Sequence, residues 1–119
     1  MSGRLTTHIL DISQGCPAQG VRVELFLVTA GEGIVKLTES VTNRDGRLDA
    51  PLLIGNDMLI GVYELLFHVG DYYRGTGDQW SDPMFLEQVP IRFSITNTEE
   101  HYHVPLLVAP GGYSTYRGS

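Results

Sequence analysis

The residues of this sequence best suited to chemistry are histidines near its two ends. His8 lies in the run Leu5-Thr-Thr-His-Ile-Leu-Asp11, while His101 and His103 alternate with other residues in His101-Tyr-His-Val-Pro-Leu-Leu107. Histidine titrates near neutral pH and can accept or deliver a proton. Partial burial beside apolar residues lowers its pKa and favours the neutral, basic form. The pattern therefore indicates general acid–base chemistry, with an activated water as the simplest nucleophile.

Further polar groups accompany these histidines. Arg47 directly follows the turn Asn43-Arg-Asp-Gly46, and the last residues include Ser114 and Tyr116. A guanidinium can pair with an oxygen-rich substrate and stabilise a developing oxyanion. We therefore treat the terminal segment 101–119 and Arg47 as parts of one candidate site.

Other chemistries fit the same residues less well. His101-x-His103 places two imidazoles on one strand face, where His8 could complete a zinc site, but no Cys, Asp or Glu follows at a recognisable ligand spacing. A triad of Ser114, His103 and a carboxylate would lack a Gly-x-Ser-x-Gly turn. The histidines could also be hydrogen-bonded residues of an interface without a catalytic role. We expect no metal and no other cofactor.

The elements that would position these residues are strands, because apolar residues recur with a period of two. Residues 70–83 contain three glycines, three aspartates and a proline, which predicts a loop with at most one helical turn at Asp71–Arg74. About eight strands at this spacing predict an all-β sandwich with at most one short helix. The expected strands are 5–12, 21–28, 34–41, a possible short strand at 47–53, 59–68 as a central strand, 87–95, and the two strands of a terminal hairpin at 101–119.

Two strands have apolar residues on both faces. In the first, Leu10 and Ile12 lie on the same side as His8, and in the other, Leu107 shares a side with His103. One face of each strand can enter the core, so the second face leaves apolar surface of the kind that marks association. We therefore expect an oligomer with histidines in its contact face.

Composition excludes several classes of protein. A length of 119 residues fits a single domain, 1–119. The formal charge of −6 argues against a nucleic-acid-binding protein. The single cysteine, Cys16, cannot form an internal disulfide, and no apolar signal or membrane-spanning run is present, so we expect a cytoplasmic protein without a membrane partner.

Several motifs together resemble one known family. The first run with His8, Asp45-Gly-Arg47 after its turn, the second histidine run, and the ending Tyr113-Ser-Thr-Tyr-Arg-Gly-Ser119 closely resemble the transthyretin-like 5-hydroxyisourate hydrolases of purine catabolism. The resemblance extends from about Leu5 to the end. The Tyr-Arg-Gly-Ser ending separates these hydrolases from transthyretin, the hormone carrier of the same fold. Ala109-Pro-Gly-Gly departs from the family pattern, which affects the shape of a turn.

The resemblance implies a transthyretin-like β-sandwich of seven or eight strands and a homotetramer built as a dimer of dimers, with active sites where the dimers meet. It implies cofactor-free hydrolysis of 5-hydroxyisourate to 2-oxo-4-hydroxy-4-carboxy-5-ureidoimidazoline in urate degradation. The alternative function is a small-ligand carrier like transthyretin, which would need no histidines and arginine in its channel.

The resemblance also assigns roles to residues. His8, Arg47 and His103 match the catalytic positions, and we expect His8 and Arg47 to bind the substrate with Tyr116 and Ser119. Two residues of the ending, Ser114 and Arg117, would support the site from behind it. His101 is the outer histidine of its motif, and we expect a catalytic role for His103 rather than for His101.

Overall fold

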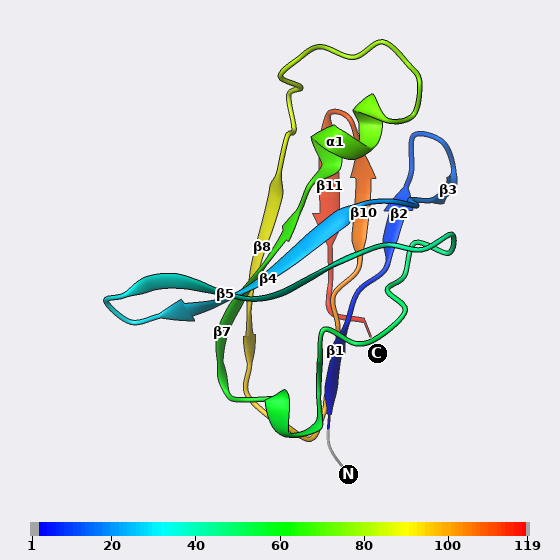
Figure 1. Cartoon of the computed structure of the whole chain (residues 1–119). Coiled ribbons are helices and arrows are strands. Elements are labelled where there is room, and N and C mark those ends of the chain that lie inside the picture. The colour runs from blue at the N-terminus through cyan, green and yellow to red at the C-terminus, as the bar shows by residue number, and fades with distance from the viewer. Residues whose placement is uncertain (1–2, 119) are drawn as a thin grey trace.

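The computed structural model of the chain describes residues 3–118, and the backbone forms two layers of β-strands (Figure 1). One layer is a four-stranded antiparallel sheet with the order β5-β4-β7-β8. Its strands are β4 (Arg22–Thr29), β5 (Gly33–Val41), β7 (Gly61–Phe67) and β8 (Val89–Ile95). The central position predicted for the strand at 59–68 is confirmed, because β7 lies between β4 and β8.

The second layer contains the first run and the second histidine run, which lie parallel to each other. Its two sheets have the orders β6-β1-β9 and β11-β10-β2-β3, and β1 pairs with β9 as β2 pairs with β10. The strands are β1 (Arg4–Thr6), β2 (Ile9–Asp11), β3 (Cys16–Pro17), β6 (Leu53–Ile54), β9 (His101–His103), β10 (Leu106–Ala109) and β11 (Gly112–Thr115).

The all-β sandwich is confirmed, but two long strands are each divided. Between β1 and β2 the buried Thr7 hydroxyl donates to the Val104 carbonyl at 2.7 Å, and the backbone of His8 forms an isolated antiparallel bridge with Arg47. The N–H groups of Val104 and Leu106 still donate to the carbonyls of Thr6 and His8, at 3.0 and 2.9 Å. These bonds keep the two runs in one layer. The additional strands therefore come from the two interruptions and from β3, which pairs with β2 where no strand was expected, and not from a different architecture.

The short strand predicted at 47–53 is the least accurate prediction. Only β6 forms there, and it pairs with β1. Pro51 has no N–H to donate, and Leu52 donates its N–H to the Leu5 carbonyl at 2.8 Å. The segment after Arg47 therefore crosses to the first run instead of returning along β5.

Helical structure is limited to two short elements among the described residues. The helix α1 (Val69–Arg74) begins two residues before the predicted turn at Asp71–Arg74, and η1 (Gly55–Asp57) is a single 3₁₀ turn. In residues 3–118 we find no helix with the length and apolar character to span a membrane.

The core lies between the layers and follows the alternation of the strands. The second layer contributes Leu5 and Ile9 from the first run, and the opposite sheet contributes Leu25, Leu65 and Phe67, all of them fully buried. The same alternation leaves Thr6, His8 and His103 only half-buried on the other side of their strands. Core packing thus fixes the position of these strands, and the side chains on their second face remain available for a functional site.

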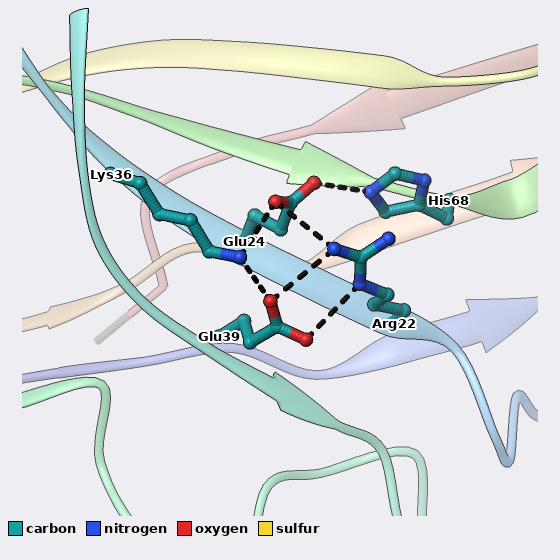
Figure 2. A network of polar contacts seen from close by, with 5 residues as sticks. All are labelled: Arg22, Glu24, Lys36, Glu39 and His68. Atoms are coloured by element: carbon teal, nitrogen blue, oxygen red, sulfur yellow. Dashed lines mark hydrogen bonds and ion pairs between the residues drawn. The ribbon is translucent and has the colours of Figure 1, made fainter.

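A cluster of charged and polar side chains connects two strands of the sheet near the start of α1 (Figure 2). Its members are Arg22, Glu24, Lys36, Glu39 and His68. The carboxylate of Glu24 lies 2.6 Å from Nε2 of His68, and both side chains are almost completely buried. This hydrogen bond lowers the pKa of Glu24. Arg22 and Lys36 also pair with Glu24 and with Glu39, lowering the pKa of Glu39 to about 2. The cluster links β4, β5 and the residue that precedes α1, on the side of the sheet away from His8 and His103.

Candidate active site

The turn at Asn43 to Gly46 brings Arg47 beside His8. The Gly46 N–H donates to the Asn43 carbonyl at 2.9 Å, and Gly46 has a φ of +76°, which glycine adopts without strain. The Gly46 carbonyl then accepts the Ile9 N–H at 2.8 Å, so the turn is attached to the first run. His8 and Arg47 consequently face each other as an antiparallel pair, although they are far apart in sequence.

The imidazole of His8 is oriented by a backbone carbonyl. Its Nε2 lies 2.9 Å from the carbonyl oxygen of Asp45. A carbonyl only accepts, so Nε2 bears the proton of the neutral ring and Nδ1 has the free lone pair. Burial, and next the charge of Arg47, lower the pKa of His8. His8 is therefore a neutral base at pH 7, with Nδ1 as its basic atom.

His103 is held between two neighbouring segments. Thr6 of β1 pairs with it on one side, and Gly118 pairs with it on the other, donating its N–H to the His103 carbonyl at 2.7 Å. A Cβ on Gly118 would lie 2.6 Å from Cδ2 of the His103 ring. The glycine of the terminal Tyr-Arg-Gly-Ser segment therefore leaves the space in which this imidazole lies.

The Thr6 hydroxyl connects the two histidines of β9. Thr6 Oγ1 lies 2.8 Å from His103 Nδ1 and 2.8 Å from His101 Nε2. Burial lowers the pKa of His103, and the charge of Arg47 lowers it further, followed by the interactions with His101 and His8. Burial and the nearby Arg4 lower the pKa of His101. Both rings are thus neutral near pH 7.

A cavity of about 400 Å³ opens in front of this group of residues. Its wall includes Arg47, His103, Thr6 and His101, and it continues along residues 48–51 after the turn. The arrangement offers a neutral base and a guanidinium to one bound molecule, which are the requirements for activating water and stabilising an oxyanion. Of the predicted catalytic residues, the structure places Arg47 and His103 on the cavity and His8 beside Arg47.

The terminal residues lie differently. Tyr116 is exposed and lines a second hollow with β8, on which Arg117 also lies. Arg117 bonds Glu100 at 2.7 Å and covers the ring of Tyr102 at 4.1 Å, which attaches the ending to β9. Ser114 is exposed on β11, opposite Leu107. Ser119 lies outside the described residues.

Sequence reasoning missed Thr6 and Arg4 as site residues. Thr6 shares a strand face with His8 by alternation, but a threonine in a strand gives no signal of its own, and its contact with His103 depends on the pairing of β1 with β9. Within residues 3–118 we find no three His, Cys, Asp or Glu side chains grouped closely enough to hold a metal ion.

Comparison with known proteins supports the resemblance seen in the motifs. Residues 5–118 match the HIUase/Transthyretin family. The chain is 58% identical to a 5-hydroxyisourate hydrolase of Halalkalibacterium halodurans over 119 residues, which cover both chains completely. It is 52% identical to a 5-hydroxyisourate hydrolase of Pseudomonas aeruginosa, over 98% of this chain and 92% of that protein.

Solved structures agree with these relatives. A Klebsiella pneumoniae 5-hydroxyisourate hydrolase is 38% identical, with a TM-score of 0.78 and coverage of 98% of this chain and 94% of that one. Transthyretin of Sparus aurata is 27% identical, with a TM-score of 0.85 over 97% and 96% of the chains. An (S)-allantoin synthase is 45% identical with a TM-score of 0.92 over 99% of this chain, which spans only 44% of that longer chain.

Proposed function

Since the chain belongs to the HIUase/Transthyretin family, we propose that it hydrolyses 5-hydroxyisourate to 2-oxo-4-hydroxy-4-carboxy-5-ureidoimidazoline in urate degradation. The observation that supports this activity most directly is the cavity shared by His103 and Arg47, with neutral His8 next to Arg47. A base and an oxyanion-stabilising cation are the two groups that hydrolysis of a cyclic amide requires.

The proposed reaction begins with water held near the histidines. His103, with His8, orients the water and accepts its proton as the water oxygen attacks a ring carbonyl of the substrate. Arg47 binds the oxygen-rich substrate and stabilises the negative oxygen of the tetrahedral intermediate through paired N–H bonds. The carbon–nitrogen bond then breaks, and the proton returns to the leaving nitrogen. The chain's own side chains provide every group of this scheme.

We also propose a homotetramer, as a dimer of dimers, in the cytoplasm. Leu10 lies on the same side of the first run as His8 and is half-buried, and Ile12, which directly follows β2, is 56% exposed. Apolar surface beside a polar cavity suits a subunit contact that closes the site. In that assembly Tyr116 and Ser119 complete the substrate pocket, and Ser114 and Arg117 support it.

The runner-up function is a carrier of a small ligand, as in transthyretin. The lowered pKa values of His8 and His103 beside Arg47 favour the enzyme, because a carrier gains nothing from neutral bases beside a guanidinium.

A direct assay separates the two functions. Urate is oxidised by uricase in the presence of the protein, and the decay of the transient 5-hydroxyisourate absorbance is followed. We expect decay much faster than the spontaneous rate. Decay at the spontaneous rate, together with tight binding of a small aromatic ligand, would support the carrier instead.

The pH dependence of the reaction should reflect the lowered histidine pKa values. Since both bases must be neutral, kcat/KM should stay constant on acidification past the ordinary histidine value of 6.5 and fall only below it. Arg47→Gln removes a cation that lowers both pKa values, so the acid limb of the remaining activity should move to higher pH. The measurement is kcat/KM against pH, with the spontaneous rate subtracted. An acid limb at the same pH in Arg47→Gln would contradict the proposed effect of Arg47 on the pKa values of His8 and His103.

A methyl group at Gly118 should disturb turnover more than folding. In Gly118→Ala the new Cβ meets the His103 ring, which must move. A displacement of about 1 Å can reduce a rate ~10²-fold, so we expect a loss in kcat of about that size with little change in the melting temperature. Gly111→Ala is the matched control, because a Cβ there meets nothing within 4 Å. Equal activities of the two variants would show that the Gly118 contact is unimportant.

A further inference from the structure

The Thr6 hydroxyl forces its two histidine partners into opposite hydrogen-bonding roles. Oγ1 lies 2.8 Å from both His103 Nδ1 and His101 Nε2. A hydroxyl has one proton to donate, so one imidazole nitrogen accepts it while the other donates its own N–H to the oxygen. The tautomers of the two rings are therefore linked through one atom.

One of the two arrangements suits catalysis. If His103 donates from Nδ1 to Thr6, its Nε2 has the free lone pair, and Thr6 in turn donates to Nε2 of His101. Both rings and Thr6 line the same cavity, and the ring centres are 6.1 Å apart. A chain of donors thus leads from His103 through a single hydroxyl to a second base.

We propose that His101 and Thr6 form a proton relay behind His103 in the hydrolysis proposed above, on which this inference rests. As the water oxygen bonds to the ring carbonyl carbon, its O–H bond breaks and the proton moves to His103 Nε2. The proton on His103 Nδ1 moves to Thr6 Oγ1, and the Thr6 proton moves to His101 Nε2. His103 is neutral again, and His101 bears the positive charge.

The relay runs backwards in the second half of the reaction. When the carbon–nitrogen bond breaks, the leaving nitrogen takes a proton from His103 Nε2, Thr6 returns a proton to Nδ1, and His101 becomes neutral. The proton taken from water has then been delivered to the product, and no other reactant is needed. The benefit is electrostatic, because the positive charge moves away from Arg47, which disfavours a charge on His103.

This proposal gives Thr6 a positioning role and explains the presence of His101 in the cavity. Arg4 also lies on the cavity and disfavours a lasting charge on His101, so the proton is held there only briefly. A purely structural hydroxyl would align His103 without any need for a basic partner on its other side. A relay requires a side chain at position 101 that can bear a proton, whereas a purely structural hydroxyl does not.

The test compares Thr6→Val, Thr6→Ser and His101→Gln with the unmodified protein in the coupled urate assay. Valine removes the hydroxyl at similar shape, serine keeps it, and glutamine can hydrogen-bond Thr6 but cannot bear the proton. We expect Thr6→Val and His101→Gln each to lower kcat about 10- to 100-fold, at or below the lower end of general acid–base contributions. KM should change little, and Thr6→Ser should retain the activity.

A spectroscopic measurement makes the test independent of turnover. Long-range ¹H–¹⁵N NMR of the histidine rings should show His103 with its proton on Nδ1 and His101 with an unprotonated Nε2, and Thr6→Val should abolish this pairing. The relay is overturned if His103 is protonated on Nε2 instead, or if His101→Gln keeps full kcat while Thr6→Val is slow. Failure of the unmodified protein to accelerate the decay would refute the hydrolase function, whatever the tautomers.

Discussion

Replacing His103 with alanine will lower kcat by ~10²- to 10⁴-fold, the range typical of a general acid–base group. His103 lies on the cavity with Arg47, and burial and the nearby cations keep its imidazole neutral at working pH. Without it, the attacking water loses the base that is proposed to accept its proton. The coupled urate assay measures the loss as the rate above spontaneous decay of 5-hydroxyisourate.

The fold should survive this substitution, because the His103 side chain is only half-buried and the core residues of β9 and β10 point the other way. An unchanged melting temperature and oligomer size would confirm that point. His68→Gln is a useful comparison, since His68 does not line the cavity and belongs to the charge cluster of Glu24 (Figure 2). It should alter stability and leave kcat close to that of the unmodified protein. Full activity of His103→Ala would contradict the proposed mechanism.

Replacing Arg47 with alanine should reduce kcat/KM by ~10²- to 10³-fold, the cost of removing one oxyanion-stabilising donor. The guanidinium faces the cavity, and its backbone position is fixed by the turn that pairs with His8. Arg47→Lys keeps the charge but loses the planar pair of donors, so we expect it to recover only part of the activity.

The neighbouring Arg44 provides the matched control for Arg47. It lies exposed in the same turn and has no place on the cavity wall. Arg44→Ala removes the same charge a short distance away and should keep kcat/KM. Equal losses in the Arg44 and Arg47 variants would indicate a general effect of charge on substrate attraction, and the specific role of Arg47 would then be wrong.

The alternation of residues in the sequence already predicted the sandwich. Leu5 and Ile9 on one side and His8 on the other were expected from a period of two, and the structure confirms this division. The prediction succeeded because alternation is local: successive side chains of a strand point to opposite faces whichever strand lies next to it. The family motifs, read from residues alone, then predicted which of the polar residues take part in chemistry, and that assignment stays a prediction.

Contacts between distant residues needed the tertiary structure. Thr6 and His103 are 97 positions apart, and they meet because β1 and β9 pair in parallel, a register that no local pattern determines. The same holds for the carbonyl of Asp45, which determines the basic atom of His8, and for Gly118, which leaves room for the His103 ring. Tyr116 shows the reverse case, since the sequence grouped it with the histidines and the structure places it in a separate hollow of the single chain.

The sequence by itself therefore determined the fold class, which histidines and which arginine are candidate site residues, and the family to which the chain belongs. The tertiary structure decided which of these residues meet and, for His8, which ring nitrogen is free. That division has a physical cause: hydrophobic alternation is a property of neighbours along the chain, whereas a hydrogen bond is made between atoms about 3 Å apart in space, such as those joining Thr6 to His101 and His103.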